Sequence, residues 1–439
     1  MKKQTLTSAL LILILTSLTF AQAPRPITSS RAGGSTKTAE PAKTVETAQP
    51  ATSLAASIIA GGASSLYSWQ IRPDDNDGYF SSDIPQPVCA NVGGVGKIFI
   101  FTNFDYYPSK NFHNYSNAVR VGEIATPADT YQLISSNVTG DPHSLPGTRQ
   151  EFAATSIIRP GDTNHTIYIF GGRNASGDLD GVYSYTPTGT LAGFKFVTNI
   201  PARLGKAGAR AGAVALPSSN GKIYLFGGAQ GGNTLLDQVL EFDPQTEQFT
   251  NKTMTMPVAF HGARGMTKAV GTNNFMYLVG ARTIAYGAPN YLIYRFDVAT
   301  GTTITVMDAN NPSVPLSIAP GSGYPMVTWD PSGNVRVIAA SGNGSSGPWT
   351  WGNIQAWILS DNYSGPNNGR ATLAAAPYTN AVRARDMAGA VKCGSSTYLI
   401  GGTYGHGTTF QNRGKLVDRL GGLIYGPAQT TGVKITLPN

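Results

Sequence analysis

Short apolar runs that end in small residues recur through most of the chain. The runs at 167–170 and 223–226 are built from Ile, Tyr, Leu and Phe, and two glycines follow each of them. Such runs, bounded by Gly, Asn, Asp or Pro, predict β-strands, and long helical periodicities are missing. Six copies recur at intervals of about 53 to 69 residues, at 98–101, 167–170, 223–226, 276–279, 335–338 and 398–400.

Each copy belongs to a longer repeat with further strand-like runs. An apolar run precedes it at 211–216, a run with Tyr or Phe before a turn follows it at 182–185 and 239–242, and a fourth, weaker run lies at 194–197. Four short antiparallel strands per repeat describe a propeller blade. The sequence therefore predicts an all-β fold, a β-propeller of six four-stranded antiparallel blades.

The third repeat carries the most specific motif. Residues 223–228 read Ile-Tyr-Leu-Phe-Gly-Gly, and the next strand ends in Phe-Asp-Pro at 242–244. This combination resembles the kelch repeat. The second and third repeats match it well, the fourth and sixth in part, and the first and fifth by strand spacing alone. The resemblance implies a six-bladed kelch-like propeller, and unrelated strands of a β-sandwich are the alternative.

A propeller ring must also be closed, because a last blade without its outer strand leaves sheet edges open. The strand-like run at 65–71 precedes the first repeat, and its Trp69 resembles the tryptophan of a kelch outer strand. We expect this N-terminal strand to pair with the last blade. The run at 433–437 is a competing candidate for the same edge.

The N-terminus has the pattern of a secretory signal peptide over residues 1–23. Two lysines precede an uncharged apolar run, and small residues suited to cleavage after Ala21 or Ala23 follow it. Residues 24–57, rich in Ala, Thr, Ser and Pro, are too poor in apolar side chains to form a core and predict a disordered linker. Residues 58–439 are left for the propeller. We expect a secreted, periplasmic or cell-envelope protein without a membrane span.

Charge gives little reason to expect a nucleic-acid partner. The formal net charge is +8, and the first 57 residues hold six basic and two acidic side chains, so they carry half of that excess. The propeller itself is only mildly basic, which argues against nucleic acid and against strong membrane binding. We expect it to be a monomer.

Four arginines stand in one apparent frame at the starts of the inner strands, each with an alanine five residues later. They are Arg149, Arg210, Arg264 and Arg385. In one interpretation they brace the fold by binding carbonyl groups of neighbouring blades, and in the other they form a basic funnel for an acidic ligand. Glu151 and Asp386 are the obvious acidic residues near these strand starts, so the arginines are only partly compensated.

Aromatic and histidine side chains are expected on the same rim. Flat rings among Gly and Asn are typical of sugar or protein contacts, although local loop packing is the alternative. The candidate ligand-binding residues, besides the arginines, are Tyr106, Tyr107, Trp349, Trp351, Tyr404, His261 and His406.

No metal or cofactor site is expected, because no spaced cluster of His, Cys or carboxylate residues is present. Copper radical oxidases share the kelch propeller, but their Tyr-Cys and Tyr-His pattern is absent here. Secreted sialic-acid mutarotases are also six-bladed and kelch-like, and the arginines and export signal fit them without a diagnostic motif. We therefore expect a binding module for an acidic glycan or a protein. An enzyme acting on an anionic sugar and a structural envelope component are the alternatives.

Two cysteines, Cys89 and Cys393, fall in the first and last repeats, which are neighbours in a closed ring. One disulfide is usual in an exported chain with two cysteines. Two buried free thiols are the alternative, since the two residues occupy different places along their strands.

Overall fold

The structure is a computed structural model, and its described residues all belong to one compact unit that spans Gln49–Asn439. The predicted signal peptide and linker lie outside the described residues and stay predictions. The described residues are 67–71, 86–101, 105–107, 112–114, 119–123, 131–133, 145–147, 149–187, 193–283, 290–318, 325–329, 333–342, 351–375, 389–394, 396–400, 403–404, 411–412 and 417–423.

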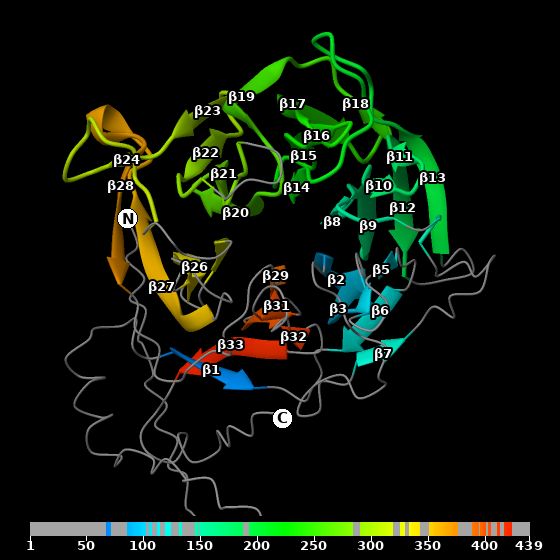
Figure 1. The fold of residues 1–439 in the computed structure, drawn as a ribbon, viewed down its shortest axis with the longest axis horizontal. Helices are drawn as coiled ribbons and strands as arrows, with labels where there is room; N and C mark the ends of the chain where they lie inside the picture. Colours follow the sequence, from blue (N-terminus) through cyan, green and yellow to red (C-terminus); the bar gives the residue numbers. More distant parts are fainter. Residues whose placement is uncertain are drawn as a thin grey trace, which may run out of the picture. The chain divides into compact units, whose positions relative to one another are not determined.

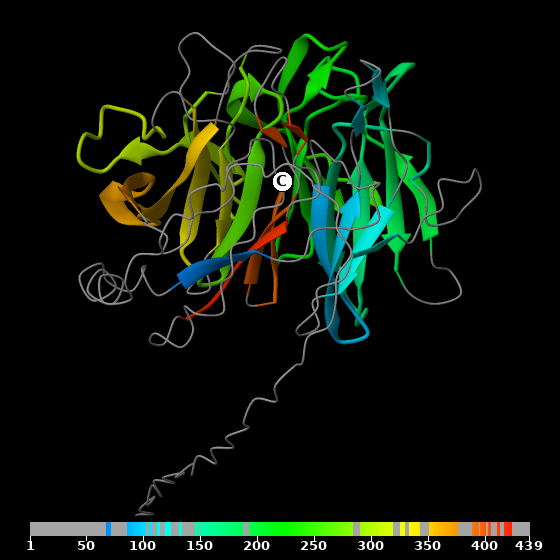
Figure 2. The same cartoon turned by 60° about the horizontal axis from the view of Figure 1, so that its bottom comes forward.

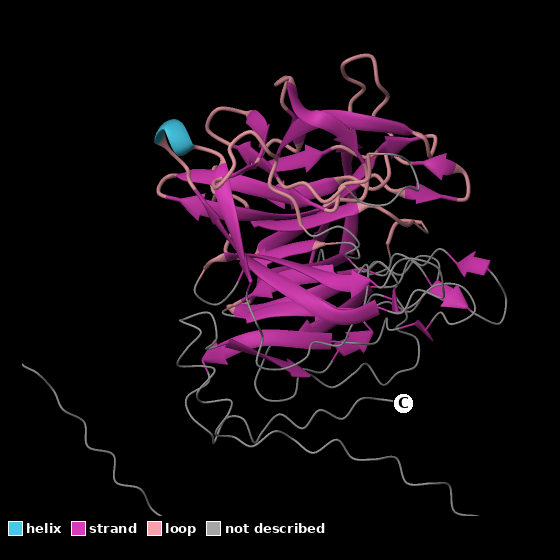
Figure 3. Cartoon of the chain, turned by 60° about the vertical axis from the view of Figure 1, so that its left-hand side comes forward, coloured by secondary structure: helices cyan, strands magenta, loops and turns pink. Residues whose placement is uncertain are grey.

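The described part of the chain is built from strands, apart from one short 3-10 turn at Gly365–Asn367 (Figure 3). Six of its sheets hold four or more strands, and we number them one to six. Sheet one contains β2 (Gln86–Val92), β3 (Val95–Phe101), β6 (Val119–Glu123) and β7 (Tyr131–Leu133). Sheet two contains β8 (Ala153–Ile158), β9 (His165–Phe170), β12 (Gly181–Thr186) and β13 (Gly193–Asn199).

Sheet three contains β14 (Val214–Pro217), β15 (Ile223–Phe226) and β17 (Thr234–Asp243), to which β16 (Ala229–Gln230), β18 (Gln248–Phe249) and β19 (Met254–Phe260) are added. Sheet four contains β20 (Arg264–Val270), β21 (Asn273–Val279), β22 (Tyr294–Asp297) and β23 (Thr302–Thr305). Sheet five contains β25 (Met326–Trp329), β26 (Val335–Gly342), β27 (Trp351–Asp361) and β28 (Arg370–Ala375), with β24 (Met307–Asp308) at its edge. Three two-stranded hairpins lie outside these sheets: β4 (Asp105–Tyr107) with β5 (Phe112–Asn114), β10 (Arg173–Asn174) with β11 (Gly177–Asp178), and β31 (Thr403–Tyr404) with β32 (Gln411–Asn412).

Sheet six combines the two ends of the described chain. Its order is β1 (Tyr67–Ile71), β33 (Val417–Leu423), β30 (Ser396–Ile400) and β29 (Gly389–Cys393). β1 pairs antiparallel with β33, with Trp69 opposite Leu420, and Figures 1 and 2 both show the blue strand beside the red one. The N-terminal strand thus pairs with the last repeat, as the sequence predicted. The competing segment at 433–437 lies outside the described residues.

The first strands of the six sheets lie around a common centre in Figure 1. β2, β8, β14, β20, β25 and β29 contact one another in this order, and β29 contacts β2. Buried apolar side chains fill the space between neighbouring sheets, so that Phe170 of sheet two stacks edge-on against Phe242 of sheet three with ring centroids 5.4 Å apart. Each sheet therefore buries its faces against its neighbours, as in a propeller.

The double glycines are required by close packing of this kind. Gly171 has φ 59°, and a Cβ atom there would lie 2.6 Å from the carbonyl oxygen of Arg210 in the next sheet. Gly227 has the same φ and would meet the carbonyl oxygen of Phe260 at 2.8 Å. An L-residue at either site would combine an unfavourable backbone conformation with a steric clash.

A disulfide joins Cys89 of β2 to Cys393 at the end of β29, with Cα atoms 5.3 Å apart. It links sheet one to sheet six through two residues that are 304 positions apart in the sequence. Of the two states left open for these cysteines, the bridged one is found in the structure.

Candidate functional site

A cavity of about 550 Å³ lies among the first strands, and residues of β2, β8, β14, β20, β25 and β29 line it. Hydroxyl and amide groups supply much of its polar surface, among them Thr155, Thr267 and Asn274. Two cations line it, Arg264 and Lys392, and none of its described lining residues is Asp or Glu. The described wall of the cavity therefore carries positive charge.

Arg149 and Arg210 are buried and bind backbone carbonyl groups of the double-glycine turns. Arg149 donates to the oxygen of Gly171 at 3.3 Å, and Arg210 donates to the oxygen of Gly227 at 3.3 Å and to Gln238 Oε1 at 2.8 Å. Burial lowers the pKa of Arg210 to about 10. These contacts match the bracing interpretation, in which the arginines hold the turn that ends the second strand.

Arg264 occupies a different strand position from Arg149 and Arg210, so the predicted common frame is wrong for it. Arg264 is the first residue of β20 that pairs with β21, and it lies opposite Val279. The equivalent first paired residues are Ala153 in sheet two and Val214 in sheet three. Arg264 therefore lines the cavity, four residues beyond the position of the bracing arginines.

Phe260, the last residue of β19, lies four residues before Arg264 and so takes the position next to sheet four that the bracing arginines take next to sheets two and three. The amide of Gly172 donates to the carbonyl oxygen of Arg210 at 2.8 Å, and the amide of Gly228 donates equivalently to the oxygen of Phe260 at 2.9 Å. The turn between β20 and β21 is shorter than the loops that join the first two strands in sheets two and three. The same spacing from arginine to alanine therefore does not place the arginine at the same position in the pairing of the first and second strands.

The remaining predicted site residues are placed in part. Tyr106 and Tyr107 fall in β4, which pairs with β5, while Trp351 begins β27 and Tyr404 falls in β31. Arg385, Trp349 and His406 lie outside the described residues. The rim that these residues were expected to form stays a prediction.

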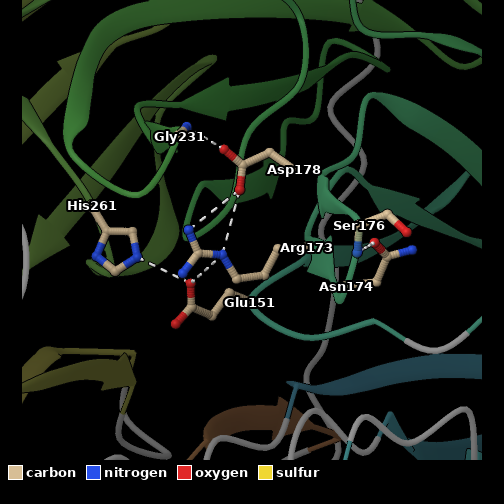
Figure 4. Close-up of polar contacts among 7 residues, drawn as sticks. All are labelled: Glu151, Arg173, Asn174, Ser176, Asp178, Gly231 and His261. Atoms are coloured by element: carbon tan, nitrogen blue, oxygen red, sulfur yellow. Dashed lines mark hydrogen bonds and ion pairs between the residues drawn. The ribbon is translucent and has the colours of Figure 1, made fainter.

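His261, another predicted site residue, belongs to a charged cluster that crosses three sheets (Figure 4). Its Nε2 lies 3.3 Å from Oε2 of Glu151, which precedes β8. The same oxygen lies 3.8 Å from Nε of Arg173, and Nη2 of Arg173 lies 3.3 Å from Asp178. Asp178 in turn accepts a hydrogen bond of 2.6 Å from the amide of Gly231, which follows β16 of sheet three. We call Glu151, Arg173, Asp178 and His261 the Glu151 cluster.

The cluster lies where the first strands begin. Glu151 is two residues before Ala153, and His261 is two residues before Ala263, and both alanines line the cavity. The amide of Gly212 donates to the carbonyl oxygen of Glu151 at 2.6 Å, which brings the starts of β8 and β14 together. We call this the strand-start end of the cavity, and the side chains of the Glu151 cluster lie beside its lining residues there and are not among them.

Glu151 has a left-handed backbone, with φ 53°. Its counterparts in sheets three and four are Gly212 with φ 66° and Gly262 with φ 76°, since each follows the residue that bridges to the segment after the second strand. A non-glycine residue in this region costs about 1–2 kcal/mol. Sheet two therefore holds a strained glutamate where two other sheets use glycine.

The carboxyl group of Glu151 is held in its charged form. Burial acts to raise its pKa, but the hydrogen bond to His261 and the charges of His261, Arg173 and Arg282 outweigh it, so the pKa is lowered. A carboxylate and an imidazole in hydrogen-bond reach can exchange a proton or bind a hydroxyl group.

Sequence reasoning found His261 and noted Glu151 only as a counter-charge. It missed Arg173 and Asp178 altogether. Their signal was their position in the chain, directly after Gly171-Gly172 in a tight hairpin formed by β10 and β11.

Two other features are absent from the described residues. No three His, Cys, Asp or Glu side chains among them gather where they could hold a metal ion. Within the same residues, no helix is long and apolar enough to cross a membrane.

Comparisons with known proteins agree with this architecture. The family model of the Kelch motif matches residues 210–253, which include most of sheet three. A Kelch domain-containing protein of Archaeoglobus fulgidus is 31% identical over 127 residues, which cover 29% of this chain and 34% of that protein. The chain thus matches about a third of the length of this relative.

The solved structure of YjhT superimposes with a TM-score of 0.50 over 80% of this chain and 95% of that chain, at 16% identity. A likeness at this identity shows the fold alone. The predicted all-β kelch-like propeller fold is confirmed by the motif, the relative and this structure together. The chain thus has a kelch-like β-propeller fold and carries a Kelch motif at residues 210–253.

Proposed function

We propose that the protein is exported and binds an acidic glycan, or an acidic surface of a protein, at the strand-start end of its cavity. A kelch propeller is a scaffold for a binding or enzyme-like module. The observation that carries the proposal is the charge of the cavity wall, which has no carboxylate among its described residues and has Arg264 at the start of β20, while Lys392 adds positive charge near the end of β29.

The arrangement of the cations favours a ligand over a purely structural role. Arg149 and Arg210 already brace their turns from buried positions, whereas Arg264 is set four residues further along and lines the cavity. Arginine presents a planar set of donors that matches a carboxylate in bidentate geometry. An acidic sugar or an acidic side chain entering the cavity would therefore meet a suitable partner.

A glycan array probed with the mature exported protein tests the proposal. We expect signals confined to glycans that carry carboxylate or sulfate groups, and we expect Arg264→Ala to weaken them about tenfold or more, because a charge-assisted hydrogen bond is lost. Arg370→Ala is the matched control, since Arg370 lies on the outer strand β28 and binds Asn367. Equal signals from acidic and neutral glycans would contradict the proposal.

An enzyme acting on an anionic sugar, like the sialic-acid mutarotases, is the second candidate. The observation that favours it is the contact of 3.3 Å between Glu151 and His261, a pair suited to proton transfer. NMR of freshly dissolved N-acetylneuraminic acid distinguishes the two, because an enzyme speeds the exchange of anomers and a binding module does not. A protein that shows neither binding nor catalysis and self-assembles would instead fit a structural envelope component.

A further inference from the structure

Glu151 occupies a backbone position that the fold itself fills with glycine elsewhere. We infer that its side chain is retained to contact the ligand, and that Oε1 of Glu151 accepts a hydrogen bond from a hydroxyl group of a sugar acid bound at the strand-start end. The inference rests on the proposed function, which it deepens by naming the residue that recognises the hydroxyl-bearing part of the ligand.

The turn at this position does not need a glutamate side chain. The amide of Gly212 donates to the carbonyl oxygen of Glu151 at 2.6 Å, and the amide of Gly262 donates to the carbonyl oxygen of Gly212 at 2.8 Å. The same contact between neighbouring sheets thus forms from a glutamate and from a glycine. An observed backbone outlier that packing does not require indicates a functional constraint.

The contacts of the Glu151 side chain with His261 and Arg173 use one of its two carboxylate oxygens. Glu151 Oε2 lies 3.3 Å from His261 and 3.8 Å from Arg173, while Arg173 has a closer carboxylate partner in Asp178. All these contacts use Oε2, and among the described residues none donates a hydrogen bond to Oε1. A group outside the described chain, such as a ligand hydroxyl, can use that oxygen.

His261 forms the other side of the same site. Its ring lies over Gly212, where a Cβ atom would come within 2.1 Å of the ring carbon Cδ2, so glycine is needed to admit it. The residue is only 8% exposed, and its buried Nδ1 has no hydrogen-bond partner among the described residues. A buried polar atom without a partner is costly unless a ligand or water completes it.

The charges around Glu151 define the class of ligand. Its carboxylate accepts hydrogen bonds and cannot donate them, so it favours hydroxyl groups. Arg173 and His261 surround it, and Arg264 begins β20 three residues beyond His261 on the cavity wall. A hydroxyl-bearing carboxylate offers both the donors and the negative charge that this end of the cavity recognises.

Three variants test the inference. Glu151→Gly removes the side chain at a position suited to glycine, Glu151→Gln keeps its shape without its charge, and Leu204→Gly is the control. Leu204 also has a left-handed backbone, with φ 54°, but it is exposed and lies outside the Glu151 cluster. Calorimetric titration with N-acetylneuraminic acid, D-glucuronic acid and inorganic sulfate measures binding, and melting temperature measures stability.

We expect Glu151→Gly and Glu151→Gln to bind at least one of the two sugar acids about tenfold or more weakly than the parent. Their affinity for sulfate should stay equal or rise, because sulfate has no hydroxyl group to donate. The melting temperature of Glu151→Gly should stay within about 2 °C of the parent, since the released strain offsets the lost contacts. Leu204→Gly should bind like the parent.

The outcomes separate this inference from the proposed function. If the parent binds a sugar acid and both Glu151 variants bind it equally well, the inference is wrong and the proposed function stands. If Glu151→Gly melts more than about 5 °C below the parent with unchanged binding, Glu151 is a structural brace. If the parent binds neither sugar acid, the proposed acidic-glycan function fails and the inference fails with it.

Discussion

The disulfide between Cys89 and Cys393 should contribute a large share of the stability of the propeller. Replacing both cysteines by alanine removes the bond and leaves no buried hydroxyl group in its place. Cys393 is buried at the end of β29 and Cys89 lies in β2, so the change acts where sheet six meets sheet one.

The size of the effect follows from the loop that the disulfide closes. The two residues are 304 positions apart, and the loss of loop entropy in the unfolded chain then corresponds to about 5.7 kcal/mol at 25 °C. Measured values for native disulfides fall at roughly 2–5 kcal/mol, because unfolded chains retain some structure. β2 and β29 also contact each other directly, so part of the contact between sheet one and sheet six persists without the disulfide. We expect a loss of about 2–5 kcal/mol.

Urea denaturation followed by intrinsic fluorescence measures this loss. The parent under reducing conditions should match the double alanine variant, and a thiol assay should find no free thiol in the native parent and two after reduction. A double variant within about 0.5 kcal/mol of the parent would show that the bond constrains little.

Four further predictions concern the scaffold and its charges. Arg210→Ala should destabilise the protein by about 2–4 kcal/mol in urea denaturation, because Gly227 and Gln238 lose a buried charged donor, and an unchanged midpoint would argue against the bracing role. Deleting residues 67–71 should lower the melting temperature markedly, since it removes the outer of the two partners of β33 and leaves only β30 beside it; a truncated chain as stable as the parent would mean that β1 is dispensable. Mass spectrometry of the exported protein should find a new N-terminus at Gln22 or Pro24, and an intact Met1 would exclude the signal peptide. The pKa of Glu151 is lowered in the folded state, so its charged form stabilises the protein above the unfolded pKa and this contribution disappears as the pH falls through the folded pKa. The melting temperature of the parent should therefore drop more than that of Glu151→Gln between pH 6 and pH 3; parallel curves would contradict this.

The repeat was readable in the sequence because each strand carries its own local pattern. The runs before Gly171-Gly172 and Gly227-Gly228 predicted strands of the right class, and they became β9 and β15. The need for glycine there was also predictable, because positive φ and close packing at a strand end exclude other residues. The pairing of the run at 65–71 with the last repeat was expected from the requirement that a propeller leaves no open edge, although the run at 433–437 competed for the same place.

The site could be predicted only in part, because it depends on register and on neighbouring sheets. Arg149, Arg210 and Arg264 do not occupy equivalent positions, although their spacing to alanine is the same. The length of each hairpin sets where the first strand begins, and the arginine spacing does not reveal that length. The sequence did not decide whether Cys89 and Cys393 are bridged, because this depends on how β2 of sheet one and β29 of sheet six lie side by side.

The sequence by itself determined the strand class, the repeat and the positions that must be glycine, because those properties depend on residues close together in the chain. Only the tertiary structure showed that Glu151 stands at a glycine position and reaches His261, 110 residues further along. That contact exists because packing brings the starts of β8, β14 and β20 together, and no local pattern in the chain encodes which side chains then meet.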